Sequence, residues 1–193
     1  MARTREFDED EVIGRAMHVF WRRGYQATSL NDLLAAMGLS KSSFYETFGT
    51  KRDLLLTALR RYAGSGMAGL IEPLLRPDAS RPEIEETLAK MVRHARSAEG
   101  RRGCLINNTL GEVAPHDPVI FAAMQESLGQ LETILIGVVA RGQQRGEITR
   151  KETPRALARF LANTFGGVNL AAKAKPGRST LDDVVRVTLR ALD

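Results

Sequence analysis

The chain has little of the residue chemistry on which small secreted domains and membrane proteins depend. One cysteine in 193 residues excludes an internal disulfide framework and is typical of a reducing compartment. No run of about 18 apolar residues is present, so no membrane span is expected. The first residues also lack the apolar core of a signal peptide. We therefore expect a cytoplasmic protein without a membrane partner.

Signatures of catalysis and of bound cofactors are missing as well. His18, His94 and His116 lie far apart in the sequence and share no ligand spacing with Cys104, so no metal site is expected. There is no phosphate-binding loop, no dinucleotide fingerprint and no nucleophile elbow. We predict that the protein is not an enzyme and needs no cofactor.

What the chain does contain is helical periodicity and an excess of basic residues. Hydrophobic residues make up 43% of the sequence, enough for a sizeable core. The net charge of +5 permits nucleic-acid binding without demonstrating it. Apolar residues recur at helical spacing throughout and no strand pattern is seen, which predicts an all-α protein of about nine helices.

Residues 24–54 are the most informative segment. Thr28 and Ser29 are good helix N-cap residues, and Asp32 follows Ser29 at the spacing of a capping box. One apolar helical face follows, made by Leu30, Leu33, Leu34 and Met37. Gly38 can take the positive φ that ends a helix. This part predicts the first helix of a helix–turn–helix.

A second short helix begins after Ser40. Phe44 and Phe48 are four residues apart and face the core together. The outer face is polar and carries Lys41, Ser42, Ser43, Tyr45, Glu46 and Thr47. A helix of this kind can enter a major groove with its N-terminal end towards the base edges. Thr50 caps the next helix and Lys51 lies in its first turn, where both can reach a phosphate.

This segment resembles the DNA-binding domain of the TetR family of transcriptional regulators. The shared pattern is a Gly-Tyr turn, Thr-Ser, Gly-Leu-Ser, Phe-Tyr, Phe and Thr-Lys. The resemblance implies phosphate contacts from Thr28, Ser40, Tyr45, Thr50 and Lys51, and base contacts from Lys41, Ser42, Ser43 and Thr47. The family often has Gly or Ala where Ser42 stands here. Glu46 could accept a hydrogen bond from a cytosine amino group or turn aside.

The remaining chain predicts a second, regulatory domain. We expect a helix–turn–helix domain over residues 1–50 and a ligand-binding and dimerisation domain over residues 51–193, with a glycine-rich joint near Gly64 and Gly66. Later helices are expected over about 80–98, 117–145, 153–174 and 180–192. The last two have apolar residues on more than one side. The family resemblance implies that they form a four-helix bundle in a homodimer, which would read a palindrome.

The control of DNA binding has two candidate explanations. Cys104 follows Arg101 and Arg102 near a predicted helix N-terminus, and both features favour a reactive thiolate. Its Gly-Cys-Leu context resembles a TetR branch that responds to electrophiles and oxidants, in which a lysine at the place of Lys173 often lies near the thiol. A lone cysteine is equally consistent with a small buried hydrophobe.

The other explanation is a non-covalent effector pocket. Its candidate lining residues are Met67, Met91, His94, Asn107, Asn108, Phe121, Met124, Phe165 and Asn169, although Met and Phe at helical spacing also fit a core. Arg3 and Arg5 could form an arm over DNA or a frayed terminus.

The sequence thus predicts a homodimeric transcriptional regulator that binds double-stranded DNA. We expect a repressor that leaves a palindromic operator on binding a small-molecule effector or on modification of Cys104. The alternative is a helical protein-interaction module that has kept the fold without operator binding.

Overall fold

The computed structural model describes residues 7–66 and 68–193, and within them all regular structure is helical, as predicted. Arg3, Arg5 and Met67 lie outside the described residues. The N-terminal part comprises α1 (Glu9–Arg23), α2 (Leu30–Met37), α3 (Lys41–Phe48) and α4 (Lys51–Arg61). No helix in the described ranges is long and apolar enough to cross a membrane.

The later helices follow the glycine-rich segment. They are η1 (Tyr62–Gly66, a π-helix), α5 (Ala68–Ile71), η2 (Glu72–Leu75), α6 (Arg81–Ala95), η3 (Gly100–Arg102), α7 (Leu105–Glu112), η4 (Ala114–His116), α8 (Pro118–Gln144), α9 (Pro154–Lys173) and α10 (Arg178–Arg190). The π-helix occupies the predicted joint, where the glycines weaken regular α-helix.

The predicted caps form and define the ends of the N-terminal helices. Ser29 and Asp32 make a reciprocal capping box at the start of α2, and Thr50 and Asp53 make another at the start of α4. Gly38 ends α2 in the left-handed conformation, at φ 69°. These short-range signals hold α3 between two sharp turns.

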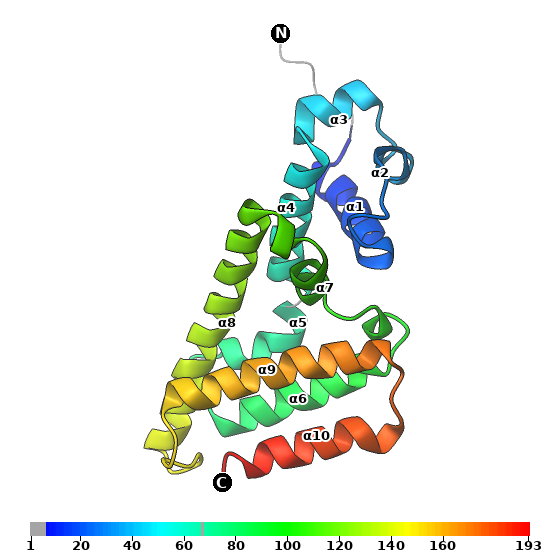
Figure 1. Ribbon diagram of the computed structural model, residues 1–193. Coiled ribbons are helices and arrows are strands. Elements are labelled where there is room, and N and C mark those ends of the chain that lie inside the picture. Colours follow the sequence, from blue (N-terminus) through cyan, green and yellow to red (C-terminus); the bar gives the residue numbers. More distant parts are fainter. Residues whose placement is uncertain (1–6, 67) are drawn as a thin grey trace.

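The molecule is elongated, with α3 at one end and α10 at the other (Figure 1). α6, α9 and α10 lie side by side at the base, while α4 and α8 run between the two ends. α7 lies between the N-terminal helices and the helices at the base. Any change at the base must therefore pass through α4, α7 or α8 to reach α3.

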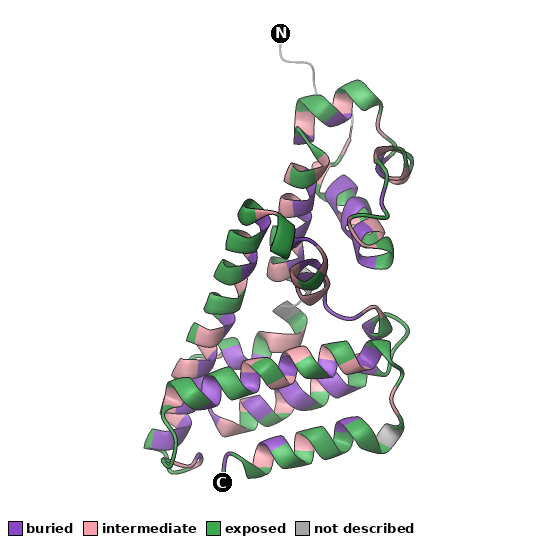
Figure 2. Cartoon of the chain, in the orientation of Figure 1, coloured by how far each residue is buried: buried purple, intermediate pink, exposed green. Residues whose placement is uncertain are grey.

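Buried residues form two hydrophobic clusters, and the first crosses from the N-terminal helices into the rest of the chain (Figure 2). Besides α1–α4 it includes Tyr62, Cys104, Leu105, Ile120 and Met124. The second cluster joins α6, α8, α9 and α10. α4 and the start of α7 therefore share one hydrophobic core with the helix–turn–helix.

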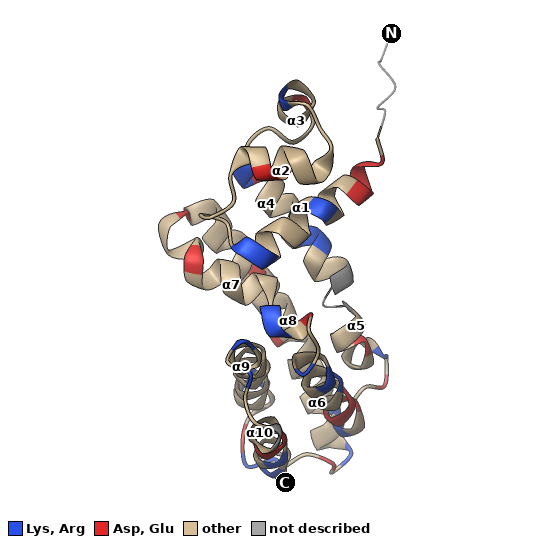
Figure 3. Ribbon diagram, turned by 90° about the vertical axis from the view of Figure 1, so that its right-hand side faces the viewer, with Lys and Arg blue, Asp and Glu red and all other residues tan. Residues whose placement is uncertain are grey.

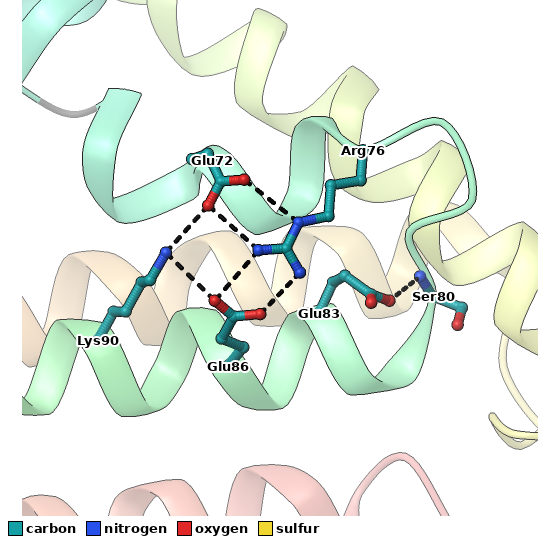
Figure 4. A network of polar contacts seen from close by, with 6 residues as sticks. All are labelled: Glu72, Arg76, Ser80, Glu83, Glu86 and Lys90. Atoms are coloured by element: carbon teal, nitrogen blue, oxygen red, sulfur yellow. Dashed lines mark hydrogen bonds and ion pairs between the residues drawn. The ribbon is translucent and has the colours of Figure 1, made fainter.

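An exposed network of ion pairs joins η2 to α6 (Figure 4). Arg76 lies between Glu72 and Glu86, with its Nη1 2.8 Å from Glu86. Lys90 lies 3.0 Å from Glu72 and 3.2 Å from Glu86. Each pair alone contributes little at an exposed position, but the shared carboxylates make a network that fixes this corner after α5.

Candidate functional site: the DNA-binding helices and the thiol junction

The outer face of α3 is polar and accessible. Phe44 is fully buried and anchors the helix, whereas the next residue, Tyr45, is 49% exposed. Lys41, Ser42 and Glu46 are exposed, and Ser43 and Thr47 are half-buried. Anchoring by Phe44 and Phe48 thus leaves the predicted base-contacting residues on the outer face of α3.

The serines at the start of α3 form a local hydroxyl cluster. Ser40 accepts a 3.1 Å hydrogen bond from the backbone N–H of Ser43, and its hydroxyl lies 3.0 Å from that of Ser42 and 2.9 Å from that of Ser43. The hydroxyl of Ser42, where the family often has no polar group, therefore joins the capping arrangement. Together they give the N-terminal end of α3 donors and acceptors that face solvent.

Thr50 and Lys51 lie at the start of α4, next to the end of α3. The Thr50 hydroxyl donates to Asp53 at 2.5 Å, and the Lys51 ammonium lies 4.2 Å from the centre of the Tyr25 ring. Burial lowers the pKa of Lys51, and the negative charge of Glu112 opposes that shift. Lys51 is thus a partly desolvated cation that lies over an aromatic ring.

Thr28 differs from the expectation of a phosphate-holding side chain. It is 1% exposed, and its hydroxyl donates a 2.6 Å hydrogen bond to the Gly24 carbonyl. A hydroxyl in that position cannot meet a phosphate, so Thr28 stabilises the turn between α1 and α2. The expectation came from the family resemblance, and the burial of this side chain does not support it.

Basic and acidic residues are interspersed over the molecule rather than gathered in one patch (Figure 3). α3 itself carries one of each sign, Lys41 and Glu46. The positive charge that could contact DNA therefore comes from single residues. Among them, Lys41 and Lys51 directly follow the N-cap residues of α3 and α4.

Cys104 is the N-cap residue of α7, as predicted, but it is buried to 4% exposure. Burial raises the pKa of its thiol. Hydrogen bonds from the N–H groups of Asn107 and Ile106 and from the Tyr62 hydroxyl oppose the shift without reversing it. The predicted stabilisation of a thiolate was therefore wrong, because desolvation outweighs the helix N-terminus.

Trp21 joins the thiol segment to the DNA-binding helices, a role that the sequence did not reveal. Its indole N–H donates a buried 2.9 Å hydrogen bond to the carbonyl of Gly103, next to Cys104. Its ring meets the Tyr62 ring edge-on at 5.2 Å, and the Arg102 guanidinium lies 5.7 Å from its centre. α1, the end of α4 and the start of α7 thus meet around Cys104. Buried indole and phenol groups usually have hydrogen-bond partners, but the tertiary structure is needed to identify those partners.

Lys173 lies beside the thiol segment but on its outer side. Its ammonium lies 3.0 Å from the Asn108 side-chain oxygen, and Asn108 donates in turn to the Arg102 carbonyl at 3.0 Å. Lys173 and Asn108 line a polar cleft together with Arg101 and Arg102. The cysteine instead faces an apolar cavity.

That cavity lies between the regulatory helices and has a volume of about 50 Å³. Five predicted residues line it, namely Met91, Cys104, Asn107, Phe165 and Asn169, together with Tyr62, Leu70, Ile71, Ile106, Ser127, Leu128, Leu131, Ala162 and Gly166. The two amides come from different helices, Asn107 from α7 and Asn169 from α9.

Four predicted pocket residues lie elsewhere. Phe121 is 44% exposed on α8, and Met124 is buried in the first hydrophobic cluster. His94 is half-buried near the end of α6, and Asn108 lines the polar cleft. Helical spacing could not separate these positions because several helix faces are apolar.

Large apolar side chains remain exposed on α9 and α10. Phe160 and Leu170 of α9 are 41% and 68% exposed, and Val184 and Val187 of α10 are exposed as well. Leu157, Leu161 and Phe165 of α9 are buried. The apolar side chains on one side of these helices therefore pack in the core, and those on the other side face solvent.

Known proteins with related sequences agree with this arrangement. Residues 12–58 match the family model described as bacterial regulatory proteins, tetR family, and residues 81–188 match that of the tetracyclin repressor-like C-terminal domain. YezE of Bacillus subtilis, an uncharacterized HTH-type transcriptional regulator, is 35% identical over 194 residues and 100% of both chains. The HTH-type transcriptional repressor ComR of Escherichia coli is 28% identical, over 97% of this chain and 90% of ComR.

Solved structures show the same fold. A cysteine-substituted CifR, a TetR family transcriptional regulator bound to 26-bp double-stranded operator DNA, has a TM-score of 0.86 at 32% identity, over 99% of this chain and 100% of that chain. The reduced form of Escherichia coli NemR has a TM-score of 0.85 at 21% identity, over 97% and 98% of the two chains. The chain therefore belongs to the TetR family of bacterial regulatory proteins and is a DNA-binding transcriptional regulator, not an enzyme.

Proposed function

We propose that the protein is a cytoplasmic, homodimeric repressor that leaves a palindromic operator when a small electrophile modifies Cys104. The observation that carries this proposal is the position of the thiol. It borders the cavity and contacts Tyr62 at the end of α4, and it follows the carbonyl to which Trp21 of α1 donates. An adduct there must displace groups that belong to the DNA-binding core.

The operator contacts follow from the accessible groups of α3 and α4. Ser40, Tyr45, Thr50 and Lys51 would hold phosphates, while Lys41, Ser42, Ser43 and Thr47 would face the bases. Thr28 contributes no side-chain contact because its hydroxyl is buried.

The dimer would form through α9 and α10. Their exposed apolar side chains are the kind of surface that an isologous two-fold interface covers. Figure 2 shows that the outer side of α10 is largely exposed in the single chain. A two-fold axis there would place two α3 helices on successive major grooves, about 34–36 Å apart.

The proposed chemistry is addition to an activated alkene. The Cys104 thiolate forms a carbon–sulfur bond to the β-carbon of an α,β-unsaturated carbonyl compound, and the α-carbon takes up a proton from solvent to replace the one that the thiol released. No oxidant is needed. Because the cavity holds about 50 Å³, a reagent of a few heavy atoms is favoured over a bulky one.

A second candidate is control by a non-covalent ligand with an inert thiol. The raised pKa of Cys104 and the amides of Asn107 and Asn169 in the cavity wall favour this reading. Both amides are half-buried, and Asn169 already donates to the Phe165 carbonyl, so a small polar ligand would bind their remaining donors and acceptors.

The test is operator binding followed by fluorescence anisotropy, with DNA from upstream of the protein's own gene. Methyl vinyl ketone should weaken binding by the wild type and leave Cys104→Ser unaffected. Tight binding that the reagent does not change would refute thiol control and favour the non-covalent ligand.

The DNA contacts have their own control. Tyr45→Ala and Lys51→Ala should bind more weakly, and Lys51→Ala should show a shallower salt dependence because one phosphate contact is lost. Unchanged DNA binding by both variants would instead show that Tyr45 and Lys51 do not contact the operator.

A further inference from the structure

Glu112, the last residue of α7, reaches across to the turn between α1 and α2. Its carboxylate accepts two backbone hydrogen bonds, from Tyr25 N–H at 3.0 Å and from Gln26 N–H at 2.8 Å. Donor and acceptor lie 87 and 86 residues apart in sequence. One carboxylate thus bridges the regulatory part of the chain and the turn that leads into the helix–turn–helix, by charge-assisted bonds.

The turn is shaped for this carboxylate. Gly24 has φ 82° and ψ 170°, a conformation that L side chains rarely adopt. A Cβ on Gly24 would lie 2.8 and 2.9 Å from the two oxygens of Glu112. The close approach of Glu112 therefore requires a residue without a side chain at this position.

The same contact reaches a predicted phosphate-binding residue. Tyr25, whose N–H is bound by Glu112, carries the ring over which Lys51 lies at 4.2 Å. The charge of Glu112 also acts on Lys51 directly and favours its protonated form. Movement of Glu112 would consequently alter both the entry to α2 and the setting of Lys51.

The other end of α7 is the thiol. Cys104 is its N-cap residue and Glu112 its last residue, and the eight residues Leu105–Glu112 form one helix of about 12 Å. The buried thiol borders a cavity of only about 50 Å³, so an added group would press on the start of α7. Displacement at Cys104 therefore has a direct route to the Glu112 carboxylate.

We propose that Glu112 is the positioning residue through which α7 transmits the state of Cys104 to the DNA-binding helices. This inference rests on the proposed thiol control. In the unmodified protein, Glu112 holds the α1–α2 turn and Lys51 in place for the operator. An adduct at Cys104 shifts α7, and Glu112 draws the turn with it.

The experiment compares operator affinity before and after methyl vinyl ketone in the full-length protein. The wild type should lose about tenfold or more, as is typical of allosteric coupling. Glu112→Gln, which can accept only one of the two N–H groups, should bind a few-fold more weakly at the start and lose less than about threefold on treatment. In this variant the turn between α1 and α2 should no longer move with α7.

Glu152→Gln is the matched control. Glu152 is exposed in the loop between α8 and α9, and its replacement removes the same charge. That loop lies at the end of the molecule away from α3 (Figure 1). It should respond as the wild type does. Mass spectrometry should show equal alkylation of Cys104 in every variant, so that a lost response is not lost chemistry.

Each outcome has a distinct meaning. If the wild type and Glu112→Gln lose affinity equally, the inference is wrong while thiol control stands. If the wild type does not respond, thiol control fails and the inference with it. Should Glu112→Gln not bind DNA at all, Glu112→Asp provides the comparison, because it keeps the charge but withdraws the carboxylate by one methylene. A full response in Glu112→Asp would also overturn the inference.

Discussion

Replacing Gly24 with alanine should destabilise the protein, and the size of the loss should depend on Glu112. Gly24 has positive φ, and an added Cβ would lie within 3 Å of both carboxylate oxygens of Glu112. Two costs therefore arise together. One is backbone strain at Gly24, and the other is displacement of a carboxylate that accepts two hydrogen bonds.

The two costs can be placed on a scale. Strain in a conformation that is nearly restricted to glycine is of order 1–3 kcal/mol. Loss of the two hydrogen bonds adds about 1 kcal/mol, at the low end for charged acceptors because the carboxylate is partly exposed to water. Gly24→Ala should therefore cost about 2–4 kcal/mol in total. In a Glu112→Ala background only the strain remains, so the double variant should be more stable than the sum of the single losses by about 1 kcal/mol.

Urea unfolding measures these differences, with the emission of Trp21 as the signal. Trp21 is the sole tryptophan and lies in the buried junction beside Cys104. All variants should be compared at one protein concentration, because the stability of a dimer depends on it.

Gly111→Ala is the matched control for the Gly24 substitution. Gly111 lies next to Glu112 in α7, and a Cβ there meets nothing within 4 Å. It should leave stability unchanged or raise it by up to about 1 kcal/mol, since alanine favours helix. If the losses from Gly24→Ala and Glu112→Ala simply add, the close approach of these residues has no energetic consequence and the reasoning is refuted.

Three further predictions concern the core, the thiol and a capping box. Phe44→Ala should cost about 3–5 kcal/mol in urea unfolding, because Phe44 is fully buried under α3, and a loss below about 1 kcal/mol would contradict its anchoring role. The rate of Cys104 alkylation should rise about tenfold per pH unit from pH 6 to 9, since burial raises the thiol pKa, and a plateau near pH 7 would contradict this. Hydrogen bonds from Ser29 and the Arg23 guanidinium lower the pKa of Asp32 to about 2. The stabilisation that the Asp32 carboxylate provides should therefore be complete above the ordinary pKa of aspartate and should fade as the pH falls towards 2. An NMR titration of Asp32 with an unshifted midpoint would refute this.

The DNA-binding helices could be predicted because their signals are local. A capping residue, a glycine at the helix end and two phenylalanines four apart act within a few residues of themselves, so Ser29, Gly38 and Phe44 behave in the fold as their pattern indicates. The resemblance to the family rests on the same short segment. Thr28 is the exception, because whether its hydroxyl faces a phosphate or a carbonyl depends on how the chain turns at Gly24.

The regulatory part could be predicted only as helices. Periodicity identified apolar faces but could not say which of them meet, so Asn107 and Phe165 line the cavity while Met124 and Phe121 do not. Arginine neighbours suggested an ionised thiol at Cys104, and the tertiary structure buries it instead.

The amino-acid sequence alone determined that this chain is helical, where its recognition helix begins and ends, and to which family it belongs, because short-range propensities and a conserved spacing of residue types suffice for each. Only the tertiary structure decided which distant groups meet. Glu112 and Trp21 carry no motif, yet they join α7 and α1 across more than 80 residues. Such contacts depend on how whole helices pack, and no sequence pattern within a single segment specifies that packing.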